Sequence, residues 1–106
     1  MDYIKFHKVD SSVNDTNITF YVNMDYVNHF ITAATTVTLK LKGLDTDVEI
    51  MDDTIVITTD GIASTKLVAD GLHSLLSSSY NSKAARTVGA GFNGASITTI
   101  AVPTAA

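Results

Sequence analysis

Apolar and polar residues alternate along three consecutive stretches between Thr35 and Thr59. In the first, Val37, Leu39 and Leu41 alternate with threonines and lysines, which is the period of two expected of a strand with one buried face. A second alternation covers residues 47–52, and a third run, rich in β-branched residues, covers residues 55–59. The pattern predicts three antiparallel strands joined by short turns.

The apolar positions also predict how the last two of these strands pair. If Asp52-Asp53 is a two-residue hairpin loop, Ile50 faces Ile55 and Val48 faces Ile57. All four apolar side chains then lie on one face, whereas a slip of one residue would turn one set to solvent. Aspartate tolerates the positive φ that such a tight loop requires.

The preceding hairpin is predicted from charge as well as from apolar residues. A four-residue loop over residues 43–46 keeps the apolar face continuous, and it sets two lysines opposite two acidic residues. These pairs are Lys40 with Glu49 and Lys42 with Asp47, and each contributes ~0.2–1 kcal/mol to pairing. Both patterns therefore predict the same register.

Further strands are predicted at both ends of the chain. Residues 3–9 and 17–24 alternate in the same way, and residues 95–102 form an uncharged final strand that suits a covered position. Residues 10–16 are rich in Ser, Asn and Asp and predict a loop. Residues 25–34 are ambiguous, and we expect a single turn or an irregular crossover there.

One amphipathic helix is predicted from Ile62 to about Ser79. Its apolar stripe consists of Val68, Gly71, Leu72, Leu75 and Leu76, and its polar face of Lys66, Asp70, His73 and Ser77.

Two details of this helix are predicted from single residues. Thr59 or Asp60 can cap its N-terminus by accepting backbone N–H bonds. Gly71 costs ~1 kcal/mol relative to alanine inside a helix, and we expect a close approach between the helix and the sheet as compensation.

These elements predict a single α+β domain over residues 1–106. An antiparallel sheet of five to six strands would carry one helix, over about residues 62–79, on one face. The chain has 106 residues, enough for one core, with 45% hydrophobic and 17% charged residues. It has no cysteine, so disulfides and thiolate sites are excluded.

Charge and hydropathy narrow the expected partners. The net charge is −4 with only seven Lys and Arg residues, which argues against a nucleic-acid surface. No apolar run reaches the ~18 residues of a membrane span. The first residues resemble a strand and not a secretion signal.

Three motifs suggest chemistry, and each has a simpler interpretation. Residues 89–94 match G-x-G-x-x-G, but a strand-like segment follows where a nucleotide site needs a helix, so we interpret them as a loop or bulge. The acidic residues at 45, 47, 49, 52 and 53 match no calcium-loop pattern. His7, His29 and His73 lie in separate predicted elements, without zinc spacing.

These observations predict no enzyme, metal or cofactor. No Gly-x-Ser-x-Gly elbow marks a nucleophilic serine. The aromatic residues are either core-edge side chains or interface anchors: Tyr3, Tyr21, Tyr26, Tyr80 and Phe92. Serine and threonine number 24, which predicts a polar surface of low charge density.

Three segments carry a resemblance to a known group of proteins. They are Tyr3-Ile-Lys-Phe6, Thr35-Thr-Val-Thr-Leu-Lys40 and Ile97-Thr-Thr-Ile-Ala-Val102, with a single amphipathic helix before the last. In layout the chain resembles small virion structural or hypothetical proteins of marine bacteriophages, especially cyanophages. The resemblance implies a structural role and self-association, and it assigns no functional residues.

The expected function is therefore that of a non-enzymatic phage structural or virion-associated protein. We expect a homo-oligomer located in the virion or the host cytoplasm, with other virion proteins as further partners. The alternative is a small binding module that recognises a glycan or peptide through a Thr/Asn/Tyr-rich surface. A third hypothesis, an enzyme, would require one of the histidines to meet a carboxylate or a serine in space.

Overall fold

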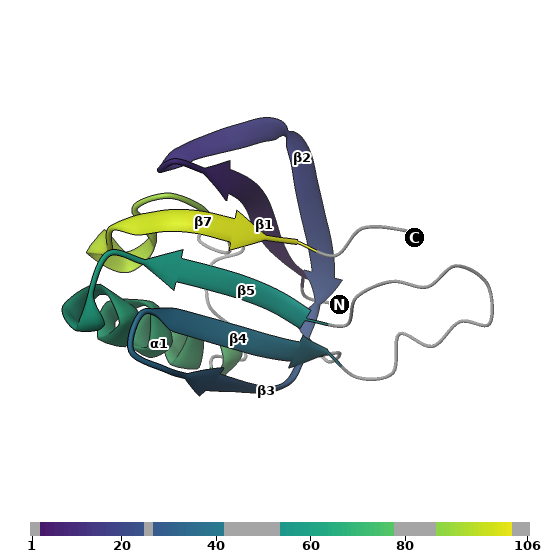
Figure 1. Ribbon diagram of the computed structural model, residues 1–106. Helices are drawn as coiled ribbons and strands as arrows, with labels where there is room; N and C mark the ends of the chain where they lie inside the picture. Colours follow the sequence, from purple (N-terminus) through teal and green to yellow (C-terminus); the bar gives the residue numbers. More distant parts are fainter. Residues whose placement is uncertain (1–2, 25–26, 42–53, 78–86, 103–106) are drawn as a thin grey trace.

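The computed structural model describes residues 3–24, 27–41, 54–77 and 87–102. It has the predicted α+β architecture: one largely antiparallel sheet with one helix on one face (Figure 1). Six strands follow the order β2-β1-β7-β5-β4-β3, and the two-residue β6 pairs in parallel with β1. The strands are β1 (Tyr3–Asp10), β2 (Val13–Asn23), β3 (Val27–Thr32), β4 (Thr36–Leu41), β5 (Thr54–Thr59), β6 (Thr87–Val88) and β7 (Ile97–Ala101).

The strands β4 and β5 were both predicted, but their pairing differs from the prediction. They pair directly with each other, Val37 opposite Ile57 and Leu39 opposite Ile55. On its other edge β5 pairs with β7, where Ile57 lies opposite Ile100. Both edges of β5 are therefore occupied.

The predicted pairing of a strand over residues 47–52 with β5 is wrong for that reason. Ile55 and Ile57 already have neighbours on both sides, so neither can face Ile50 or Val48 in the sheet. Lys40 lies opposite Thr54 on one side and His29 on the other, not opposite Glu49. Residues 42–53 themselves, with the Lys42–Asp47 pair and the Asp52-Asp53 turn, lie outside the described residues. The alternation within β4 and β5 was compatible with more than one partner strand.

The loop predicted over residues 10–16 is also wrong. Ser11 and Ser12 alone form the turn, with φ of 52° and 68°, and Asp10 lies opposite Val13. Left-handed backbone at both positions is what a tight two-residue hairpin requires. The polar residues after the turn belong to an exposed part of β2, where polarity is no obstacle to a strand.

Residues 27–32, within the segment expected to be a turn or crossover, form the strand β3. Its partner is β4, with Phe30 opposite Leu39 and Ile31 opposite Thr38. A register shift between Val27 and His29 interrupts the ladder. The β-branched residues in this segment favour the strand over the helical spacing of its apolar residues.

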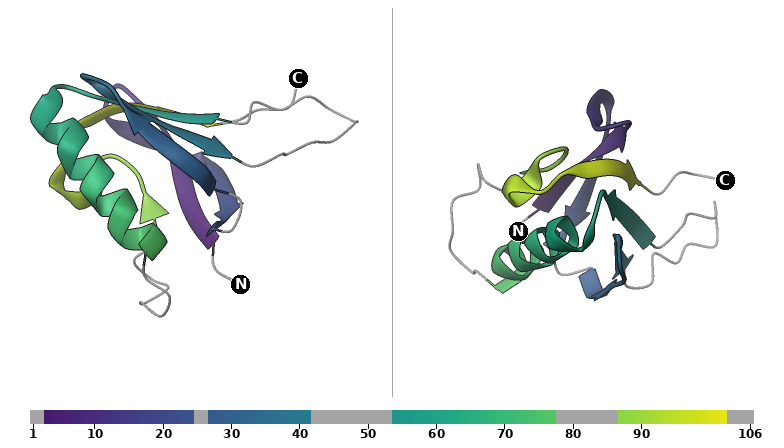
Figure 2. Two further views of the ribbon diagram at one scale, coloured as in Figure 1. Left: turned by 90° about the horizontal axis from the view of Figure 1, so that it is seen from below. Right: turned by 60° about the vertical axis from the view of Figure 1, so that its left-hand side comes forward.

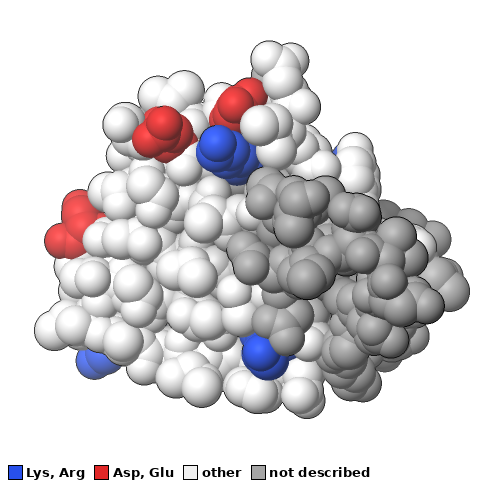
Figure 3. Space-filling model, turned by 45° about the vertical axis from the view of Figure 1, so that its right-hand side comes forward, with Lys and Arg blue, Asp and Glu red and all other residues white. Residues whose placement is uncertain are grey.

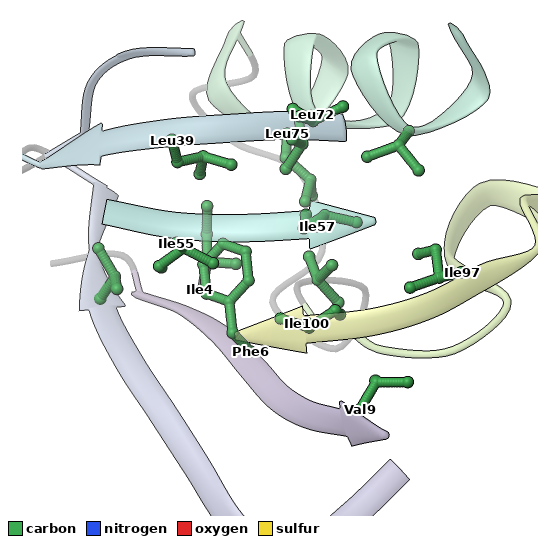
Figure 4. Close-up of a cluster of buried hydrophobic side chains, with 14 of the residues drawn as sticks. Ile4, Phe6, Val9, Leu39, Ile55, Ile57, Leu72, Leu75, Ile97 and Ile100 are labelled. Atoms are coloured by element: carbon green, nitrogen blue, oxygen red, sulfur yellow. The ribbon is translucent and has the colours of Figure 1, made fainter. Parts of the chain in front are cut away.

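The helix α1 (Ile62–Ser77) packs on the sheet beside β4 and β5, as predicted (Figure 2). Its buried residues include four of the predicted stripe, Val68, Gly71, Leu72 and Leu75, and Leu76 packs against the core. They meet the apolar face of the sheet, which includes Ile4, Phe6, Leu39, Ile55, Ile57 and Ile100 (Figure 4). The predicted polar face of the helix is exposed.

The final strand lies in the middle of the sheet, between β5 and β1, which agrees with its uncharged sequence. A register shift near Thr58 and Thr59 lets both Ile97 and Ile100 face the core, although they are three residues apart. Before this strand, the short helix η3 (Phe92–Gly94) packs against α1. Strand β7 thus connects the N-terminal hairpin, β1 and β2, with the β4–β5 pair in one sheet.

Candidate functional site

The face of the sheet opposite α1 carries rows of small hydroxyl and apolar side chains. Thr36, Thr58 and Thr99 lie opposite one another across β4, β5 and β7. The next row is Thr38, Val56 and Ala101. No described element lies over these rows (Figure 2). We call this surface, made of the two rows, the threonine face.

Charged side chains are sparse among the described residues on this side of the molecule. Figure 3 shows a wide area without charged side chains, and acidic and basic residues lie around its margin. Within the described part of β4, β5 and β7, Lys40 is the one charged residue. A surface of this kind can approach another surface at little cost in desolvated charge.

The same face continues onto the N-terminal hairpin, where it becomes aromatic. Tyr3 and Tyr21 are 47% and 58% exposed. The Lys5 ammonium lies 5.9 Å from the centroid of the Tyr21 ring, within range of a cation–π interaction. His7 Nδ1 is 2.9 Å from Thr19 Oγ1. These two tyrosines are exposed, whereas Phe92 packs against the core, and Tyr26 and Tyr80 lie outside the described residues.

Two hollows lie between the edge strand β3 and the helix α1. The first, of about 270 Å³, is lined by residues that include Thr32, Ala33, Ile62, Lys66 and Asp70. The second, of about 420 Å³, is lined by Met24, Val27, Asn28, His29, Phe30, His73 and Leu76. These hollows could not be predicted, because residues 25–34 were expected to form a turn or crossover and not the strand β3. The β-branched residues Val27, Ile31 and Thr32 were the signal for that strand.

The three histidines do not converge. His29 and His73 line the same hollow, whereas His7 lies on β1 beside Thr19. Within the described ranges, no three His, Cys, Asp or Glu side chains are placed to hold a metal ion. Apart from Asn28, the other residues that line this hollow are apolar: Met24, Val27, Phe30 and Leu76.

The glycine-rich segment at residues 89–94 has a structural use. It joins β6 to β7 through η3, a helix of three residues, so no helix N-terminus is available for a phosphate. Gly91 and Gly94 have positive φ of 81° and 80°, a conformation that strains other residues. Ala90 N–H donates to Asn14 Oδ1 at 2.9 Å, which ties the loop to β2.

The predicted acidic cluster at 45, 47, 49, 52 and 53 lies outside the described residues. The described helix is too short and too polar to cross a membrane. Among the described residues, the surfaces open to a partner are therefore the threonine face, the tyrosine region beside it and the two hollows between β3 and α1.

Comparison with known proteins adds no relative: no family model, no curated protein and no solved structure matches this chain.

Proposed function

We propose that this chain is a non-enzymatic structural protein that works by associating with copies of itself. The observation that carries the proposal is the threonine face, a wide and almost uncharged surface opposite the helix. Flat sheet faces with side chains in register can pack on one another at about 10 Å separation. Threonine suits such a contact because its methyl group packs and its hydroxyl can bond across the interface.

The resemblance to marine-phage virion proteins supports a place for this assembly in a phage particle. Other virion proteins would then be further partners. A capsid or tail gene beside the coding sequence would agree with this setting, whereas a metabolic operon would contradict it.

Static light scattering over a concentration series tests the self-association. The average mass should rise above the 11.3 kDa of one chain. Thr58→Lys places a charge at the centre of the Thr36–Thr58–Thr99 row and should lower the average mass at high concentration. Ser74→Lys, on the exposed side of α1, is the matched control and should leave it unchanged. Equal masses for the two variants would contradict a role for the threonine face.

A second candidate function is a small binding module for a glycan or peptide. Tyr3 and Tyr21 favour it, because exposed aromatic side chains beside a lysine provide stacking and cation–π contacts. Chemical shifts of the tyrosine ring protons, followed during titration with glycan and peptide libraries, test this function. A ligand that changes the chemical shifts of the Tyr21 ring and binds more weakly to the Tyr21→Ala variant would support this function. No chemical-shift change with either library would oppose it.

A further inference from the structure

We propose that β3 pairs edge to edge with β3 of a second copy, in antiparallel orientation, around a two-fold axis at Ile31. The sheets of two chains would then form one continuous sheet. This inference rests on the proposed self-association, and it adds the edge strand β3 to the threonine face as a second contact surface.

The two edges of the sheet differ in how they are protected. The edge strand β2 has a register shift against β1 between His7 and Lys8, and it carries Asp15. Asp15 also accepts the backbone N–H of Asn17 at 3.1 Å. Bulges and charged residues are the usual devices that prevent edge pairing. The strand β2 is therefore protected against pairing with a further strand.

The edge strand β3 has neither proline nor a Lys, Arg, Asp or Glu residue, and Ile31 on it is 61% exposed. The absence of charge favours a copy of the same chain as the partner. A two-fold axis brings each residue near its own equivalent, so a charged strand would repel itself.

Backbone hydrogen bonds identify which groups are available for pairing. Ala33 N–H donates to Thr36 O at 2.8 Å, so residues 33 and 36 form a hydrogen-bonded pair. Such pairs alternate with non-hydrogen-bonded pairs along an antiparallel ladder. Ile31, opposite Thr38, therefore directs its N–H and C=O toward β4. The same groups of Phe30 and Thr32 point outward from the sheet, and none of the described strands pairs with this edge of β3.

The position of the axis follows from the regular part of the strand. The register shift lies between Val27 and His29, and the hairpin turn follows Ala33. Residues 29–33 are thus the regular segment, and Ile31 is its centre. A two-fold axis at Ile31 pairs Phe30 with Thr32 of the second copy through their outward groups. Ile31 then faces its own equivalent in a non-hydrogen-bonded pair, the type in which side chains approach most closely.

The helix would contribute to the same interface. Side chains of α1 and β3 line the same two hollows, and a two-fold axis perpendicular to the sheet places the two helices on the same side of the joined sheet. Lys66 and Asp70 line the hollow beside Thr32 and Ala33, and the axis places this hollow near the His29–Phe30 part of β3 in the other copy, where His73 and Leu76 line the second hollow. Ile62, 61% exposed in the first hollow, adds apolar area.

Single cysteines test the register, because the natural chain has none. Ile31→Cys should form a disulfide-linked dimer as the major species under oxidised glutathione, since a directly opposed pair meets the ~4.4–6.8 Å Cα separation of a disulfide. Asn28→Cys, exposed on the same strand, and Val13→Cys, exposed on β2, are the matched controls and should stay monomeric on a non-reducing gel. Equal crosslinking of all three variants, or none for Ile31→Cys, would overturn the inference.

A second variant checks the same contact without a crosslink. Ile31→Lys should shift the dimer to single chains at concentrations where the natural chain is dimeric, with an unchanged circular dichroism spectrum. If the natural chain associates but Ile31→Cys fails to crosslink, the β3 interface is wrong and the proposed function stands. If the natural chain is a single chain at every concentration, both are wrong. A β3 edge that binds a foreign extended peptide in place of a second copy would also overturn the inference.

Discussion

The ring of Phe92 lies against Gly71 of α1, so close that a Cβ atom at position 71 would be 2.7 Å from Phe92 Cε2. Asn93 strengthens this contact, because its Nδ2 donates to Leu67 O at 2.8 Å. The close approach predicted for Gly71 is therefore real, but the neighbour is η3 and not a strand of the sheet. Helix α1 is held between the sheet and the loop before β7.

Gly71→Ala should destabilise the protein although alanine favours helices. Alanine gains ~1 kcal/mol in helix propensity over glycine. Overpacking against Phe92 costs ~1–3 kcal/mol. We therefore expect a net loss of about 1 kcal/mol in the free energy of unfolding. Urea denaturation followed by circular dichroism measures it. Gly61→Ala is the control, because nothing lies within 4 Å of the added methyl group. A gain of stability in Gly71→Ala would show that Phe92 moves aside at no cost.

The two sides of β5 should respond differently to truncation. Ile57 is fully buried between Val37 and Ile100, so Ile57→Ala should cost ~2–5 kcal/mol. Thr58 faces the opposite side, and Thr58→Ala should cost less than ~1 kcal/mol. The difference between the two midpoints of chemical unfolding checks the register of β5. Similar losses would mean that β5 is wrongly oriented.

A buried pair of hydroxyls links the start of α1 to the sheet. Thr59 and Thr65 are only 4% and 3% exposed, and their Oγ1 atoms are 2.7 Å apart. Thr65 Oγ1 also donates to Ala34 O at 3.1 Å. Thr59→Val should cost ~1–3 kcal/mol because it leaves buried polar groups unpaired.

The double variant Thr59→Val/Thr65→Val tests whether the two hydroxyls act together. Its loss in the free energy of unfolding should be smaller than the sum of the single losses by ~0.5 kcal/mol or more. Thr58→Val, on the threonine face, is the matched control for the change of side chain. Additive losses would show that the two hydroxyls act independently.

The sequence predicts an element well where one face is buried and the period is clear. Val37, Leu39, Ile55 and Ile57 have this property, and both of their strands were predicted with correct inward faces. Alternation is a property of one strand, however, and the choice of a partner depends on the whole sheet. The predicted partner of Ile57 is Val48, which lies near it in sequence. Its actual neighbours in the sheet, Val37 and Ile100, lie farther away along the chain. For β4, two agreeing local patterns, apolar and charged, predicted residues 47–50 as its neighbour, whereas its neighbours are β3 and β5.

The interaction surfaces were harder to predict than the core. An edge strand such as β3 has weak alternation, because its core-facing side is only partly covered, and Phe30 is half-buried. Tyr3 and Tyr21 are exposed because they lie on the face of the sheet opposite α1. Alternation alone does not predict which face the helix covers. The expected meeting of copies through the threonine face stays a prediction.

Sedimentation equilibrium of the natural chain over a wide concentration range tests self-association most directly. One chain has a mass of 11.3 kDa, so a two-fold dimer has twice that mass, 2 × 11.3 = 22.6 kDa. We predict a mass of 22.6 kDa or more at high concentration, falling toward 11.3 kDa on dilution. A constant mass of 11.3 kDa over the whole range would contradict the proposed assembly.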